Sequence, residues 1–245
     1  MSSSQGHFVP TEWLAAIAGK KLFYPCAGND VLEPTLIFAP IVSELWYGDI
    51  AYPVGLRMGC VLQQGPHQDY ALKDVEIVGD AHARMERREG YRFLSPSKRI
   101  ETYWRQDGSS VRVIRRRGFG QIALGAEFPD DSLGVFFYRG DGGGESGSGV
   151  SFFQDKRHRY APLQNLFSLL CRKLAKPALV VTDGSNNSRR SNLPVSQFFS
   201  TAVSSKEAFM LCRDKVWEAG NLRWRCVGFA GRRYGPTLVW AVEPV

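Results

Sequence analysis

Two short runs of the sequence are apolar at almost every position, residues 133–138 (LGVFFY) and 178–181 (ALVV). A strand with one face in water alternates apolar and polar residues, whereas a continuous apolar run of this length is typical of a strand buried on both faces. Such strands occur in α/β proteins, where helices cover both faces of a sheet. The two runs therefore predict an α/β fold with a buried central sheet.

The segments around these runs alternate between helical and extended patterns. Ser204 and Glu207 have the spacing of a capping box, which marks the start of a helix, and Gly220 is the expected end of that helix. We expect helices over residues 10–19, 161–176 and 204–219. We expect strands over residues 22–24, 43–49, 133–138, 178–183, 222–227 and 237–242, the last two as a terminal hairpin.

The middle of the chain has a different pattern, with four short β-rich runs and a turn signal at residues 106–109 (QDGS). It predicts an antiparallel, β-rich insertion at about residues 60–130 that carries basic side chains on exposed faces. No linker divides the chain, so we expect one domain over residues 1–245, with residues 1–9 as a disordered lead. The β-rich runs are residues 75–78, 99–105, 111–114 and 121–124.

Composition limits the class of protein. No apolar run approaches the roughly 20 residues that a membrane span needs, and the N-terminus lacks the pattern of a secretory signal. Five cysteines without a C-x-x-C pair predict reduced thiols, a cytoplasmic location and no bound metal. The formal net charge of +7 favours an anionic partner, either nucleic acid or an acidic protein, although a solvated basic face is the better explanation of any single cluster.

The turn after residues 22–24, Pro25-Cys-Ala-Gly-Asn-Asp30, raises a choice between a nucleotide-type binding turn and an ordinary strand-to-helix turn. The order of predicted elements around it resembles the class I S-adenosylmethionine-dependent methyltransferase family over residues 20–50 and 133–245. The resemblance implies a Rossmann-like sheet of six strands wound with helices, with a seventh strand returning antiparallel at the end. It also implies S-adenosylmethionine as the cofactor.

The family carries an acid and then three alternate glycines after its first strand, where this chain has Tyr24 and then Cys26, Gly28 and Asp30. Glycine suits these positions because a Cβ keeps the backbone away from the ligand, so Cys26 and Asp30 narrow or reshape the site. Asp49 ends the second strand, as the family's ribose-binding acid does. The resemblance thus implies cofactor contacts at Pro25, Cys26, Gly28, Asp30 and Asp49.

Residues 139–149 (RGDGGGESGSG) follow a buried strand, and ligands of open α/β sheets bind outside the carboxyl ends of strands. We expect Asp141 and Glu145 of this loop, with Asp183 after the next buried strand, to supply acid–base groups. Asp141 or Glu145 should then lie within about 10 Å of Gly28 or Asp183, a span that one small ligand bridges. The alternative is a flexible surface loop.

Arg115, Arg116 and Arg117, near the aromatic Tyr103 and Trp104, form a candidate clamp for a nucleic acid strand. The sequence leaves two functions open. One is a divergent methyltransferase-like protein with a polar pocket at the strand carboxyl ends. The other is a non-catalytic binding or scaffold protein for an anionic partner such as nucleic acid.

Overall fold

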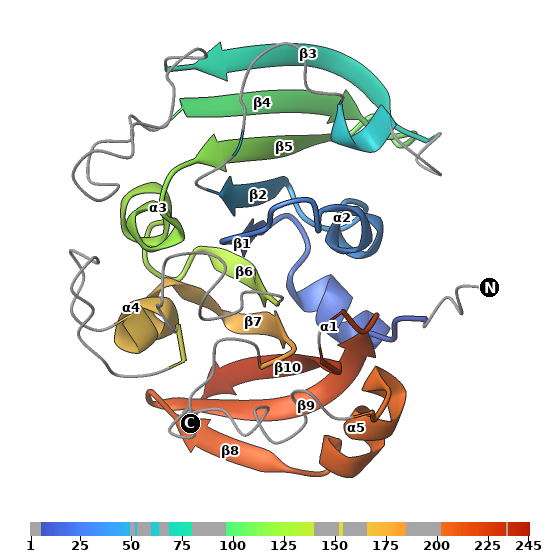
Figure 1. Cartoon of the computed structure of the whole chain (residues 1–245), viewed down its shortest axis with the longest axis vertical. Coiled ribbons are helices and arrows are strands. Elements are labelled where there is room, and N and C mark those ends of the chain that lie inside the picture. The colour runs from blue at the N-terminus through green and yellow to red at the C-terminus, as the bar shows by residue number, and fades with distance from the viewer. Residues whose placement is uncertain are drawn as a thin grey trace.

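The computed structural model describes residues 6–49, 52, 60–63, 69–79, 97–139, 152–153, 166–184, 202–233 and 235–245. Within these ranges, ten strands form one mixed sheet in the order β3-β4-β5-β2-β1-β6-β7-β10-β9-β8 (Figure 1). Helices pack against this sheet, which confirms the predicted α/β class. None of the described helices is both long and apolar enough to cross a membrane.

Five neighbouring strands at the centre of the sheet run parallel to one another. Every residue of β6 is buried, as its continuous apolar run predicts. Beyond them the sheet turns antiparallel, because β10 (Thr237–Pro244) runs against both β7 and β9 (Leu222–Ala230). In sheet order the parallel strands are β5 (Ser110–Arg117), β2 (Glu44–Asp49), β1 (Lys21–Tyr24), β6 (Leu133–Tyr138) and β7 (Leu174–Thr182).

The sheet ends in antiparallel strands on both sides. β4 (Ser97–Trp104) and β3 (Ala71–Val78) extend it beyond β5, and β8 (Val216–Ala219) pairs with β9 at the opposite edge. The tight turn at residues 106–109 joins β4 to β5, with the Asp107 carboxylate accepting hydrogen bonds from Ser109, which confirms the predicted hairpin. Because β5 itself pairs in parallel with β2, β3 and β4 are the described strands of the predicted insertion that lie outside the parallel part of the sheet.

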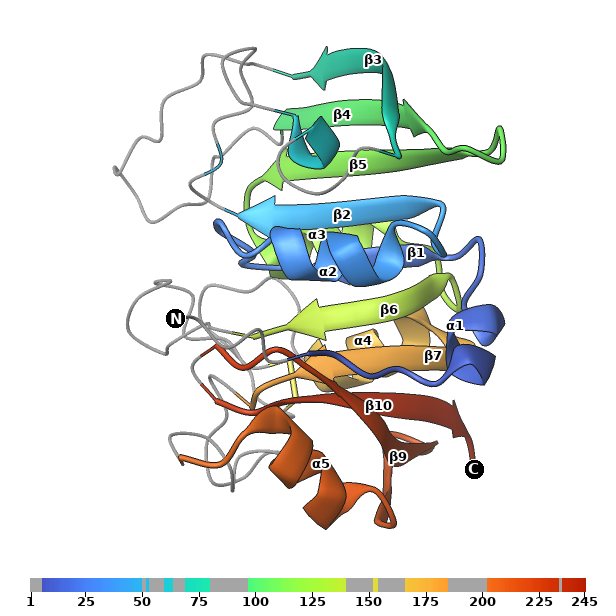
Figure 2. The same ribbon diagram turned by 90° about the vertical axis from the view of Figure 1, so that its right-hand side faces the viewer.

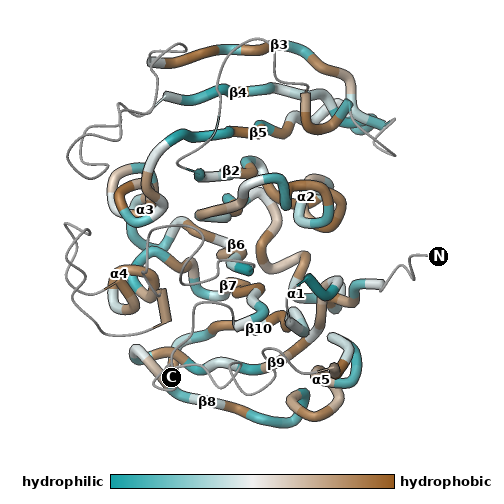
Figure 3. The backbone as a smooth tube through the Cα atoms, viewed as in Figure 1, coloured by the Kyte–Doolittle hydropathy of each residue, from teal (hydrophilic) through white to brown (hydrophobic). Residues whose placement is uncertain are grey.

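Helices lie on both faces of the central strands. In Figures 1 and 2, α1 (Thr11–Ala16) and α2 (Leu32–Phe38) cover one face, whereas α3 (Gly120–Glu127) and α4 (Leu166–Lys173) cover the other. The short 3₁₀ helix η1 (Val61–Gln63) precedes β3, and α5 (Ser205–Cys212) packs on β9 and β10. In Figure 3, α2 is mostly hydrophobic in colour, whereas β8 and β9 mix hydrophilic and hydrophobic residues.

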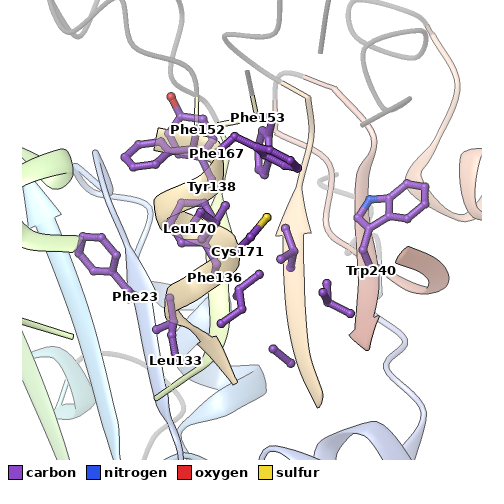
Figure 4. Packing of buried hydrophobic residues seen from close by; sticks show 14 of the residues in the cluster. Phe23, Leu133, Phe136, Tyr138, Phe152, Phe153, Phe167, Leu170, Cys171 and Trp240 are labelled. Atoms are coloured by element: carbon purple, nitrogen blue, oxygen red, sulfur yellow. The ribbon is translucent and has the colours of Figure 1, made fainter. Parts of the chain in front are cut away.

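Two hydrophobic clusters fill the space between the helices and the sheet, one on each face. In the cluster under α4, the rings of Phe136 and Tyr138 from β6 both pack on Phe152, at centroid distances of 5.2 Å (Figure 4). On the other face, Tyr24 packs on Phe137 at 4.8 Å. Adjacent residues of β6 thus point into opposite clusters, and this double burial keeps the strand ends in fixed positions.

One sequence prediction about local structure is wrong because parallel strands need crossovers. Residues 121–124, expected as a β-rich run, lie in α3, which connects β5 to the parallel strand β6. α2 likewise connects β1 to the parallel strand β2. A short apolar run does not distinguish strand from helix, and the crossover between parallel strands decides it.

All three predicted helices end earlier than expected, and the one predicted over residues 10–19 ends at Ala16 within α1. The helix predicted over residues 161–176 ends at Lys173 within α4, because Leu174 already pairs with Leu133 as the start of β7. The helix predicted over residues 204–219 ends at Cys212, and the following residues pair with β9 as β8. Gly220 lies in the turn between β8 and β9 with φ of 63°, and is not the end of a helix.

The expected disordered lead, residues 1–9, belongs in part to the fold. Residues 1–5 lie outside the described residues, but Phe8 exchanges two backbone hydrogen bonds with Phe229 of β9, at 2.8 and 2.9 Å. Gly228 makes this approach possible, since a Cβ there would collide with the carbonyl group of Phe8.

Candidate functional site

The parallel strands place their carboxyl ends at one edge of the sheet (Figure 2). From β1, the chain builds outward in one direction through β2 and β5, and then in the other direction through β6 and β7. The strand order therefore reverses between β1 and β6. In open α/β sheets, this reversal point is where ligands bind.

The turn after β1 has an unusual backbone. Cys26 has φ of 56° and Gly28 has φ of 50°, so both lie in the left-handed region. A non-glycine residue there costs about 1–2 kcal/mol, and such residues collect at functional sites. α3 packs directly on this turn. Its first residue, Gly120, lies so close to Pro25 that a Cβ at position 120 would collide with that proline. The turn thus keeps a backbone suited to glycine at a position where the sequence has cysteine.

Gly28 is bonded on both sides of its backbone. Its N–H donates to Oδ2 of Asp49, the last residue of β2, at 3.0 Å. The hydroxyl of Tyr52, which is nearly completely buried, donates to the carbonyl oxygen of Gly28 at 2.7 Å. Burial and the neighbouring Asp49 charge raise the pKa of Tyr52, which keeps this hydroxyl protonated. The sequence-predicted pair, Gly28 and Asp49, is therefore brought together at the sheet edge.

A second group of side chains crosses the reversal point itself. Arg139, the residue after β6, donates from Nε and Nη2 to the two carboxylate oxygens of Asp30, at 2.6 and 2.9 Å. Its Nη1 contacts Glu33 of α2 and the carbonyl oxygen of Gly231, both at 2.6 Å. Arg233 adds an ion pair to Asp30 at 2.9 Å. We call Asp30, Glu33, Arg139 and Arg233 the Arg139 cluster.

The centre of the Arg139 cluster is shielded from water, with side-chain exposures of 4% for Arg139 and 11% for Asp30. Burial alone would raise the pKa of Asp30, but the hydrogen bonds and charge of Arg139 outweigh it, with help from Tyr24 and Arg233, and hold that pKa below its ordinary value. Burial and the Asp30 charge raise the pKa of Tyr24 well above its usual range, so its hydroxyl stays a donor to Asp30.

Asp183, one of the predicted acid–base groups, follows β7 and is completely buried. Thr182 before it accepts a hydrogen bond from the backbone N–H of Gly184 at 3.1 Å. Asp141 and Glu145 lie outside the described residues, and with them the predicted distances to Gly28 and Asp183. Within the described part of the chain, no group of three or more His, Cys, Asp or Glu residues is arranged to hold a metal ion.

The expectation that residues 115–117 lie on an exposed basic face is wrong. Their exposed fractions are 6%, 3% and 6%, and Tyr103 beside them is also buried. Residues 113–117 of β5 are all buried, so these guanidinium groups meet acceptors inside the protein. The partners of residues 115, 116 and 117 are, in that order, Glu101, Glu127 and Ser97. Residues 115–117 therefore do not form the exposed clamp for nucleic acid that the sequence predicted.

Sequence reasoning did not include Arg139, Glu33, Tyr52 or Arg233 among the site residues. Arg139 carried a usable signal, since it directly follows a buried strand, and ligands of open α/β sheets bind at the carboxyl ends of such strands. The other three carried none, because their roles depend on contacts with residues distant in the sequence.

Comparison with known proteins leaves the site to be judged on its own geometry. No protein-family model matches this chain, and no curated protein is significantly similar to it.

Proposed function

We propose that this chain is a methyltransferase-like protein that binds a nucleoside-type ligand at the carboxyl edge of β1 and β2, with Asp49 and the Gly28 turn as the ribose subsite. The hydrogen bond from the Gly28 N–H to Asp49 is the observation that carries the proposal. It joins an acid at the end of the second strand to a left-handed turn after the first. This is the combination that nucleotide-binding sheets use to hold a ribose.

The order of strands supports the same proposal. With β3, β4 and β8 left out, the remaining strands can be numbered from first to last along the chain. They then lie in the sheet in the order 3-2-1-4-5-7-6, and the last of them, β10, is antiparallel to both of its neighbours. Without its antiparallel strand this is the doubly wound order 3-2-1-4-5-6. A seventh strand that returns antiparallel is the feature by which the methyltransferase family extends that order. Methyl transfer from S-adenosylmethionine is the activity that this likeness implies.

A second candidate is a non-catalytic binding protein for an anionic partner. It is favoured by the Arg139 cluster, whose ion pairs already connect the turn after β1, helix α2 and the residue after β6 across the point where a cofactor would bind. The net charge of +7 is the reason to consider an anionic partner.

The test is calorimetric titration of the full chain with adenosine, S-adenosylhomocysteine and S-adenosylmethionine. In the Asp49→Asn variant, the amide oxygen still accepts from the Gly28 N–H, but the carboxylate that would accept from a ribose hydroxyl is gone. A charged hydrogen bond contributes about 1.5–3 kcal/mol, so we expect nucleoside binding to weaken roughly 10- to 100-fold with little change in melting temperature.

Asp214→Asn is the matched control, since the Asp214 side chain is 88% exposed and lies between α5 and β8. It should bind as the unmodified protein does. Equal affinity in the Asp49→Asn variant would contradict the assignment of the ribose subsite. Nucleoside binding without transfer of a labelled methyl group to any protein or nucleic acid tested would favour the non-catalytic candidate.

A further inference from the structure

We infer that this site selects a nucleoside whose 5′ carbon carries no anionic group, and disfavours nucleotides and ligands with a carboxylate tail. The inference rests on the proposed ribose subsite and concerns the part of the ligand that extends beyond the ribose. Because S-adenosylmethionine carries a carboxylate tail, the inference argues against that cofactor as the ligand of this site. It follows from the side chains that occupy the position next to the ribose subsite.

The position of a 5′ substituent follows from that of the ribose. In nucleotide-binding sheets, the acid after the second strand holds the ribose hydroxyls, while the turn after the first strand and the helix that follows hold the phosphate attached to the 5′ carbon. Here the acid is Asp49, the turn contains Gly28, and the helix is α2. A 5′ substituent would therefore approach Asp30 and the first turn of α2.

Two carboxylates already occupy that position. Glu33 lies in the first turn of α2, and its Oε1 accepts from the backbone N–H of Gly231 at 2.5 Å. Asp30 stands where a glycine would let a phosphate approach the backbone, and its side chain is fixed by Tyr24 and Arg139. A phosphate placed here would meet two fixed negative charges.

Neither arginine of the cluster offers compensation to such a phosphate, since Arg233 already pairs with Asp30 at 2.9 Å and Arg139 is fully engaged. Its Nε and both terminal nitrogens already donate to Asp30, Glu33 and the Gly231 carbonyl, and its side chain is 4% exposed. A 5′-phosphate would have to break these bonds or face the carboxylates directly, and like charges in contact cost several kcal/mol. A neutral 5′ group avoids both costs.

The test is calorimetric titration with two neutral nucleosides, adenosine and 5′-methylthioadenosine, and two anionic ligands, adenosine 5′-monophosphate and S-adenosylhomocysteine. We expect both neutral nucleosides to bind at least about tenfold more tightly than the monophosphate, and methylthioadenosine to bind more tightly than S-adenosylhomocysteine.

Asp30→Asn should reduce the ratio of adenosine affinity to monophosphate affinity at least about tenfold, because it removes one negative charge and leaves Arg139 with excess positive charge. Glu33→Gln, whose side chain is more exposed at 23%, should act in the same direction if Asp30→Asn folds poorly. Asp214→Asn should leave the ratio unchanged. A preference for the monophosphate in the unmodified protein, or an unchanged ratio in a folded variant, overturns this inference alone. Failure of every ligand to bind overturns the proposed function as well.

Discussion

Asp30 illustrates how a single residue is stabilised inside this fold. A carboxylate with 11% side-chain exposure loses most of its hydration, which is costly unless cations and hydrogen-bond donors replace the water. Arg139, Arg233 and the Tyr24 hydroxyl supply these groups within 2.6 to 2.9 Å. The ionised form of Asp30 is therefore a stabilising element of the folded state, and its protonation should weaken the fold.

The sign of this effect gives a prediction. Because the folded pKa of Asp30 lies below its ordinary value of 3.8, the unfolded chain takes up a proton first as pH falls. The stabilisation is fully present above the ordinary value and is lost as pH falls through the folded pKa. We expect the free energy of unfolding to fall as pH drops below about 5 and on through the ordinary value of 3.8, and to fall less steeply in the Asp30→Asn variant.

Denaturant unfolding over this pH range measures that free energy, with Asp214→Asn as the control for an exposed acid. Parallel acid profiles for Asp30→Asn and the unmodified protein would show that the Arg139 cluster contributes little to stability.

At the scale of elements, α5 begins with the capping box that the sequence predicted. The Ser204 hydroxyl accepts from the backbone N–H of Glu207 at 3.2 Å, and the Glu207 carboxylate accepts from the backbone N–H of Ser204 at 2.8 Å. This reciprocal cap satisfies two donors that the first turn of a helix leaves without intrahelical partners. The spacing of the two residues in the sequence was enough to predict it.

The cap gives a second prediction. Ser204→Ala should lower the free energy of unfolding by about 1 kcal/mol, since it removes the acceptor for the Glu207 N–H. The exposed Lys206, in the first turn of the same helix, provides the control substitution Lys206→Ala, which should change the free energy by only a few tenths of a kcal/mol. Chemical denaturation measures both. Equal effects from the two variants would mean that α5 does not depend on its cap.

At the scale of the whole molecule, the sheet has a buried centre and two outer strands. β6 is buried along its whole length, whereas none of the positions of β3 or β8 is buried. The described residues place β3 and β8 last in the order of strands, so each pairs with one neighbour. Backbone hydrogen bonds that few packed side chains protect open more easily.

Hydrogen exchange of the native protein should follow this arrangement. We expect amides in β1, β6 and β7 to exchange only with global unfolding, and amides in β3 and β8 to exchange at least about tenfold faster through local opening. Mass spectrometry of peptides from each strand measures the difference. Protection in β3 equal to that in β6 would mean that a further element covers this edge of the sheet.

Several parts of the fold and site were determined by the sequence itself. The run 133–138 predicted a strand buried on both faces, and Asp49 was predicted at the end of a strand near Gly28. These predictions succeed because burial periodicity, strand length and the residue at a strand end are properties of a few neighbouring residues.

Only the tertiary structure decided which charged side chains meet. Arg139 pairs with Asp30, which lies 109 positions earlier in the chain, and residues 115–117 are buried against acceptors on β4 and α3. In the sequence, an arginine that forms a buried ion pair looks the same as one on a solvated face. The difference arises only when the fold brings a carboxylate within reach and excludes water from the pair, because the hydration that a charge loses must be replaced by a partner from elsewhere in the chain.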